Sequence, residues 1–332
     1  MVNGHGRMLI AAPYLGEFGW ELLNWQGRVR WEAVHGGYDR VAVCATPDRR
    51  PLYEAAGPAL PDGRLVFCPV AQLDPPGAAS EDHRIDEAGR PIAADRLRAV
   101  AEAAARSACR EAGLDCGDAV ILTPGYTGGL WPTTSEHQVF AELRQPAALT
   151  TDVLLVPRRR ELAPERNLAE SWWEDLAGEL RQAGLRVEMY EPPLEEAIRR
   201  ISRSRLAAGA STGGLHLASL CRCPHYVWGS GPESRWTRLG ITNRQRYETI
   251  WNPLGTACRY DECGWRPAVP RVRDAICRSL ETIGLAPGRS PPSWSLKPRW
   301  RLRRGLARLL DPESASAAVP WRVREFVRTH VV

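Results

Sequence analysis

The stretch Ser211-Thr-Gly-Gly-Leu-His-Leu-Ala218 combines residue types that suit the binding of an anion. Ser211 and Thr212 stand where helix N-cap residues belong, and Gly213 and Gly214 after them allow the backbone to approach a ligand closely. The free N–H groups and the dipole of a helix that starts here attract a phosphate, and His216 falls in its first turn. An ordinary joint between a strand and a helix, with a buried histidine, has the same pattern, so the rest of the chain must decide.

A second glycine-rich loop, Gly16-Glu-Phe-Gly19, follows an apolar run from Met8 to Ala12 that reads as the first strand. We expect Glu17 at the carboxyl edge of the sheet, where its carboxylate can take a proton from a substrate hydroxyl as a general base. A charge that complements the dipole of the following helix is the alternative role. Glu21, one helical turn further on, is the competing candidate for the base.

A basic loop completes the set of candidate site residues. Arg158, Arg159, Arg160 and Arg166 follow the apolar run Val153–Val156, and guanidinium groups bind phosphates in a bidentate manner. A solvated run of charges is the alternative interpretation.

Apolar runs that read as buried strands alternate along the chain with segments of helical periodicity, which is typical of parallel α/β sheets. We expect strands near residues 7–12, 40–44, 65–68, 119–123, 153–156, 185–189, 208–210 and 226–228, and helices near 20–34, 95–112, 171–183, 194–202, 215–220 and 269–283. Residues 69–94 and 124–146 read as loops or insertions. The alternation restarts near residue 148 and predicts two Rossmann-like domains, 1–148 and 149–288, that face each other across a ligand-binding cleft.

The composition is that of a globular chain: 332 residues, 44% hydrophobic and 25% charged, with no apolar run near the ~20 residues of a membrane span. The start of the chain lacks the pattern of a signal peptide, so we expect the cytoplasm. The nine cysteines are then expected to be free thiols. Cys221-x-Cys223 and Cys258-x4-Cys263 lack the usual spacing of a structural zinc site, so no metal is expected there.

The net charge of +5 comes almost wholly from arginine, because Lys297 is the only lysine. Residues 289–332 are expected to form a basic, tryptophan-containing helical tail. This tail would lie either on an anionic membrane surface or back across the first domain. No nucleic-acid-binding module is recognisable. The chain also has no Walker A sequence, G-x-S-x-G elbow or H-E-x-x-H motif, and no D-x-D pair of the kind that holds a nucleotide sugar through a divalent metal.

Three motifs, in this order, resemble the heptosyltransferase-type GT-B enzymes of glycosyltransferase family 9. They are Leu15-Gly-Glu17 after the first strand, Val156-Pro-Arg-Arg-Arg160 through Asn167 to Trp172-Trp173, and Ser211–Ala218. Glu17 and Ser211 stand where that family usually has aspartate. Glycosyltransferase family 61 and fucosyltransferase-like GT-B enzymes are the second-best match.

The resemblance implies a metal-independent, inverting transfer of a hexose or heptose from a nucleotide sugar to a hydroxyl of a glycan, lipid-linked or metabolite acceptor. This is chemistry of bacterial cell-surface polysaccharide synthesis, in the cytoplasm or on the inner face of the membrane. It requires no cofactor beyond the donor. It implies a base, Glu17; a donor diphosphate site of Arg158, Arg166, Ser211, Thr212, Gly213, Gly214 and His216; and an acceptor site of Gly16, Phe18 and Trp20. A non-catalytic sugar-nucleotide or glycan-binding protein and a nucleotide-sugar epimerase of the same fold are the alternatives.

Overall fold

The computed structural model describes residues 7–54, 64–71, 73, 78–79, 82–86, 90, 92–124, 138–161, 163–190, 193–230 and 242–283. The predicted basic tail from residue 289 lies outside these residues, as does most of the connection 124–146. Within the described part, no helix has the length and apolar character needed to cross a membrane.

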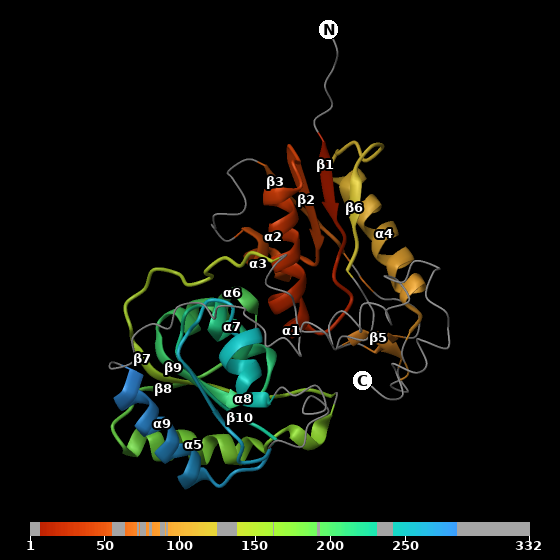
Figure 1. The fold of residues 1–332 in the computed structure, drawn as a ribbon. Coiled ribbons are helices and arrows are strands. Elements are labelled where there is room, and N and C mark those ends of the chain that lie inside the picture. Colours follow the sequence, from red (N-terminus) through yellow and green to blue (C-terminus); the bar gives the residue numbers. More distant parts are fainter. Residues whose placement is uncertain are drawn as a thin grey trace, which may run out of the picture.

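The first sheet is four-stranded and parallel, with the order β3-β2-β1-β6 (Figure 1). Its strands are β1 (Met8–Ala11), β2 (Arg40–Ala45), β3 (Leu65–Pro69) and β6 (Val120–Leu122). The helical segment after β1 comprises α1 (Phe18–Trp20), a π-helical turn η1 (Glu21–Trp25) and α2 (Gln26–His35). Shorter helices η2 (Pro47–Arg49) and α3 (Arg50–Glu54) follow β2, and α4 (Ala94–Glu111) precedes β6.

The second sheet is five-stranded and parallel, with the order β11-β10-β9-β7-β8. Its strands are β7 (Thr151–Val156), β8 (Val187–Met189), β9 (Ser204–Ala210), β10 (His225–Trp228) and β11 (Cys258–Asp261). The helical elements are η4 (Pro164–Arg166), α5 (Glu170–Gln182), α6 (Leu194–Ser202), α7 (Gly213–Leu220), α8 (Asn243–Gln245), η6 (Arg246–Ile250) and α9 (Val269–Ile283). The prediction of two parallel α/β sheets is confirmed.

Side chains that alternate along the strands divide the interior into three apolar layers. Leu9 and Ala11 of β1 face the layer under α2, whereas Ile10 faces the layer under α4. In β7, Val153 and Leu155 face α5 and α9, while the alternate side chains face α6 and α7. The layer under α2 continues into the layer under α6 and α7, so one apolar cluster joins the two sheets. Each sheet is therefore covered on both faces, as its near-continuous apolar strands require.

Three details differ from the sequence prediction. Strand β9 begins at Ser204, before the predicted start near residue 208. Residues 78–79 and 82–86, expected in a loop, form a short antiparallel pair, β4 (Ala78–Ala79) and β5 (Asp82–Asp86). The strand β11 was not anticipated, because Cys258-Arg-Tyr-Asp261 carries two charged residues and lies at the edge of its sheet, where burial demands less.

Candidate functional site

A pocket of about 360 Å³ lies where the loops after β1, β7, β9 and β10 meet. In the first sheet the strand order reverses between β1 and β6, and in the second between β7 and β9. Open parallel sheets bind ligands beyond the carboxyl ends of the strands at such reversals. The topology thus places the loops after β1, β7 and β9 at ligand-binding positions, and the pocket lies between them.

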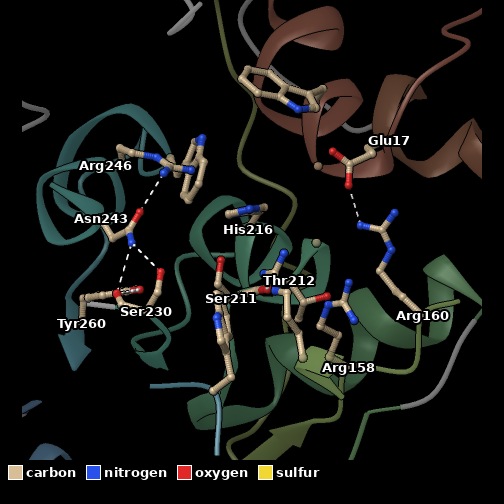
Figure 2. A pocket seen from close by; sticks show the side chains of 16 residues that line it. Glu17, Arg158, Arg160, Ser211, Thr212, His216, Ser230, Asn243, Arg246 and Tyr260 are labelled. Atoms are coloured by element: carbon tan, nitrogen blue, oxygen red, sulfur yellow. Dashed lines mark hydrogen bonds and ion pairs between the residues drawn. The ribbon is translucent and has the colours of Figure 1, made fainter. Parts of the chain in front are cut away.

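The pocket brings together residues from both sheets (Figure 2). Its lining comprises Glu17, Gly19 and Trp20 from the first sheet's side, and Arg158, Arg160, Arg166, Ser211, Thr212, Gly213, His216, Ser230, Asn243, Arg246, Trp251, Tyr260 and Trp265 from the second. Of the residues predicted from the sequence, Glu17, Trp20, Arg158, Arg166, Ser211, Thr212, Gly213 and His216 line it.

Three predicted residues, Gly16, Phe18 and Gly214, lie beside the pocket and do not line it. A Cβ at Gly16 would come within 2.6 Å of the Tyr14 ring, and a Cβ at Gly214 within 2.7 Å of a Val156 methyl group. Phe18 lies under the guanidinium of Arg49, 4.5 Å from the ring centroid. The structure gives these three positions packing contacts.

Glycines allow the first helical turns of α1 and α7 to pack against each other. A Cβ at Gly213 would lie 3.0 Å from Phe18, and one at Gly19 would lie 3.1 Å from the His216 ring. Gly213 and Gly214 are the first two residues of α7 itself, and Thr212 is its N-cap residue, without a hydrogen bond from its side chain to the helix. Gly19 and Gly213 therefore allow close approach between the two α/β units, with the N–H groups at the start of α7 beside the pocket.

The arginines of the loop after β7 are held at different depths. Arg158 is 2% exposed, and its guanidinium donates to the carbonyl of Ala163 at 2.9 Å and to the side chain of Asn167. Arg166 donates to the Ser211 carbonyl at 3.1 Å and stacks on Trp265 at 4.0 Å. Burial lowers the pKa of Arg166, and its buried Nε has no partner among the described residues. A desolvated cation with an unused donor gains free energy when an anion binds.

A further arginine comes from a segment that the sequence left unassigned. Arg246, which begins η6, is 6% exposed, stacks on Trp251 at 3.6 Å and donates to Asn243 Oδ1 at 2.7 Å. The Asn243 amide donates to the carbonyl and hydroxyl oxygens of Ser230, each at 3.2 Å (Figure 2). The Tyr260 hydroxyl donates to the same carbonyl at 3.1 Å. The sequence points to these residues only through the mixture of arginine and aromatic residues in 243–265. Their spacing matches neither a helix nor a strand, so it did not predict a site.

His216 lies at the base of the pocket, 8% exposed, with its ring stacked on Tyr247 and in an edge contact with Trp251. Burial, reinforced by the positive charge of Arg246, lowers its pKa to about 3. The imidazole is therefore neutral at pH 7, and its Nδ1 has no partner within the described part of the chain. Such a ring can offer one hydrogen bond to a ligand but no positive charge.

The structure separates the two glutamates that competed for the role of base. Glu21 is 4% exposed and lies outside the pocket, where it accepts hydrogen bonds from Tyr53 at 2.9 Å and Arg49 at 3.0 Å. Its pKa is raised by burial, against the opposing effect of Arg49. Glu17 lines the pocket and pairs with Arg160 at 2.5 Å, an ion pair that connects the two α/β units (Figure 2). Glu17 is therefore the carboxylate that a ligand in the pocket can reach.

Among known proteins, no protein-family model matches the chain, and no curated protein matches its sequence. Some solved structures are similar in fold. The iron-containing dodecameric glycosyltransferase TibC from enterotoxigenic E. coli is 14% identical, with a TM-score of 0.37 over 67% of this chain and 58% of TibC. The E. coli heptosyltransferase WaaC with ADP is 12% identical, with a TM-score of 0.40 over 82% of this chain and 99% of WaaC.

A glycosyl transferase of family 9 from Veillonella parvula is 8% identical, with a TM-score of 0.45 over 86% of this chain and 99% of the other. All three are transferases of sugars, the class that the motifs resemble. These similarities concern the fold alone.

Proposed function

We propose that the chain is a glycosyltransferase that binds a nucleoside diphosphate sugar in the pocket between its two α/β units. The supporting observation is the charge of the lining: four arginines, the start of α7 and one carboxylate, Glu17, opposite them among the described lining residues. A diphosphate with its sugar has complementary charge, and it fits at strand-order reversals where nucleotides bind in open α/β sheets.

In the proposed reaction, Glu17 takes the proton from an acceptor hydroxyl as that oxygen bonds to the anomeric carbon of the sugar. The bond to the diphosphate breaks on the opposite face, so the configuration at this carbon inverts. The arginines and the N–H groups of α7 stabilise the charge that develops on the leaving diphosphate. Because guanidinium groups supply this positive charge, we propose that no divalent metal is needed. The acceptor is a hydroxyl of a glycan, lipid-linked or small-molecule substrate, reached from the cytoplasm or the inner face of a membrane.

Neighbouring arginines offer a matched test of donor binding. Arg160 lines the pocket, whereas Arg159 lies outside it, more than half exposed, and pairs with Glu170. Calorimetric titration with nucleoside diphosphates should show affinity that falls about ten-fold in Arg160→Ala, the loss of one charge-assisted contact. Arg159→Ala should bind like the wild type. Equal affinities in the two variants would contradict a diphosphate site here.

Turnover distinguishes transfer from binding alone. A panel of nucleotide sugars, offered with and without candidate acceptors, should give release of the nucleotide that depends on the acceptor. Binding of nucleoside diphosphates without any turnover across the panel would instead assign the chain to the non-catalytic sugar-nucleotide-binding class.

A further inference from the structure

Three cysteine thiols meet in the apolar layer under α4, far along the chain from one another. Cys44 on β2 and Cys68 on β3 are direct neighbours in the register of the parallel strands, and Cys109 on α4 lies over them. The Cys44 and Cys109 sulfurs are 3.7 Å apart, those of Cys109 and Cys68 4.0 Å, and all three lie within 4.8 Å of one another. Each residue is at most 1% exposed, and all three are free thiols.

The triangle of sulfurs has the dimensions of a metal site. A point equidistant from the three sulfur atoms lies between about 2.2 and 2.5 Å from each, which brackets the ~2.3 Å of a zinc–thiolate bond. Three independent elements supply the ligands, so the geometry is set by the packing of α4 on the sheet. Buried cysteines usually serve as small apolar residues, but that role does not require three thiols to converge on one point.

We propose that this thiol triangle, Cys44, Cys68 and Cys109, binds one Cu(I) ion per chain. Thiolate sulfur selects soft ions, chiefly Cu(I), zinc and iron–sulfur clusters. Structural zinc requires four ligands, and the described residues place no fourth His, Cys, Asp or Glu ligand at this cluster. Cu(I) accepts three sulfur ligands, which is the number that the packing provides.

Binding of an ion also changes the charge of the site. The surroundings are apolar, with Leu97, Ala101 and Ala105 in the same layer, and an uncompensated charge there is costly. Cysteine ligates a metal as thiolate, so each thiol that binds releases its proton to solvent, and the positive ion offsets part of the charge that forms. Neither copper nor sulfur changes oxidation state on binding.

The test is an anaerobic titration of the full chain against a chromogenic Cu(I) chelator. The wild type should remove one equivalent of Cu(I) from the chelator, release thiol protons in weakly buffered solution, and gain thermal stability. Cys44→Val and Cys109→Ala should remove no Cu(I) from the chelator. Valine suits the strand at position 44, and alanine suits the helix at position 109. Cys277→Ala, at a half-buried thiol on α9, is the matched control and should behave like the wild type.

Circular dichroism shows whether each variant remains folded, and two variants on different elements guard against the failure of one. The proposal is overturned if a folded Cys44→Val or Cys109→Ala variant still removes its equivalent of Cu(I). Tighter binding of Zn(II) than of Cu(I) at these thiols would also overturn it, as would a Cys44–Cys109 disulfide in anaerobically isolated protein. None of these outcomes depends on whether the chain transfers sugar.

Discussion

Replacing Glu17 by glutamine should separate ligand binding from catalysis, with changes in opposite directions. Glutamine keeps the size of the side chain but removes the negative charge, and with it the ability to accept a proton from a hydroxyl. The same change releases Arg160 from its ion pair and leaves the pocket more positive. We therefore expect Glu17→Gln to bind a nucleoside diphosphate more tightly than the wild type, while it transfers sugar far more slowly.

The expected change in diphosphate affinity follows from the exposure of the Arg160–Glu17 ion pair. The side chains of Arg160 and Glu17 are 27% and 29% exposed, so their ion pair contributes about 1 kcal/mol at most. If the diphosphate gains that amount, its dissociation constant falls about five-fold. Loss of a general base lowers turnover by about 10²- to 10⁴-fold.

Calorimetric titration with a nucleoside diphosphate measures the first effect, and an assay of acceptor-dependent nucleotide release measures the second. Glu170→Gln is the matched control, because Glu170 pairs with Arg159 in solvent, away from the pocket. It should change neither quantity. Full turnover in Glu17→Gln would refute the assignment of the base. Weaker diphosphate binding in that variant would refute the assignment of an anionic ligand to the pocket.

Four further predictions concern stability and the pocket. Gly209→Ala should lower the free energy of unfolding by 2 kcal/mol or more in urea titrations, roughly the cost of overpacking, because its Cβ would lie 2.5 Å from a backbone oxygen of the neighbouring strand. Gly178→Ala, in the middle of α5 with open space around it, should raise that free energy by about 0.5–1 kcal/mol. Burial lowers the pKa of His225 from 6.5 to about 4, so the unfolded chain binds more protons between these values, and stability is lost as the pH falls from 6.5 towards 4. Between pH 7 and pH 5, the free energy of unfolding should fall by about 2 kcal/mol less in His225→Leu than in the wild type, in the same titrations. A pH dependence equal to that of the wild type would contradict this assignment. Arg246→Lys keeps the charge but not the flat stacking on Trp251, so diphosphate affinity should fall about ten-fold, and wild-type affinity would show that the charge alone matters.

The buried strands could be predicted from the sequence because both faces of each sheet are covered. Val153–Val156 reads as an unbroken apolar run, since its alternate side chains enter two different apolar layers. Helix α6 was predicted with its observed bounds, because its apolar residues repeat at helical spacing and serine and arginine follow. Thr212-Gly213 was predicted at a helix start for the same kind of local reason.

Contacts between distant segments could not be predicted in this way. Arg246 lies in a short π-helical segment without amphipathic period, and it enters the pocket only because α8 and η6 pack beside β11. The convergence of Cys44, Cys68 and Cys109 likewise depends on strand register and on the placement of α4. Glu17 is the N-cap residue of α1 and Glu21 lies one turn further on, so local pattern favours Glu17 as the base but leaves Glu21 as a competing candidate. The partners of Glu21, Tyr53 and Arg49, decide between the two glutamates.

The net positive charge of the pocket lining indicates the chemistry of the ligand more directly than any single sequence motif does. Among the described residues that line the pocket of about 360 Å³ are four arginines, one glutamate and a neutral histidine. A site for a neutral glycan alone would hold these cations together against their mutual repulsion with only Glu17 to offset it. The proposed nucleoside diphosphate would offset it, and its sugar would then extend from the arginines towards Glu17, on the side of the first sheet. The cost of gathering the arginines is therefore best explained by a ligand that spans the two units, with its phosphates on the second unit and its reacting carbon beside the carboxylate of the first.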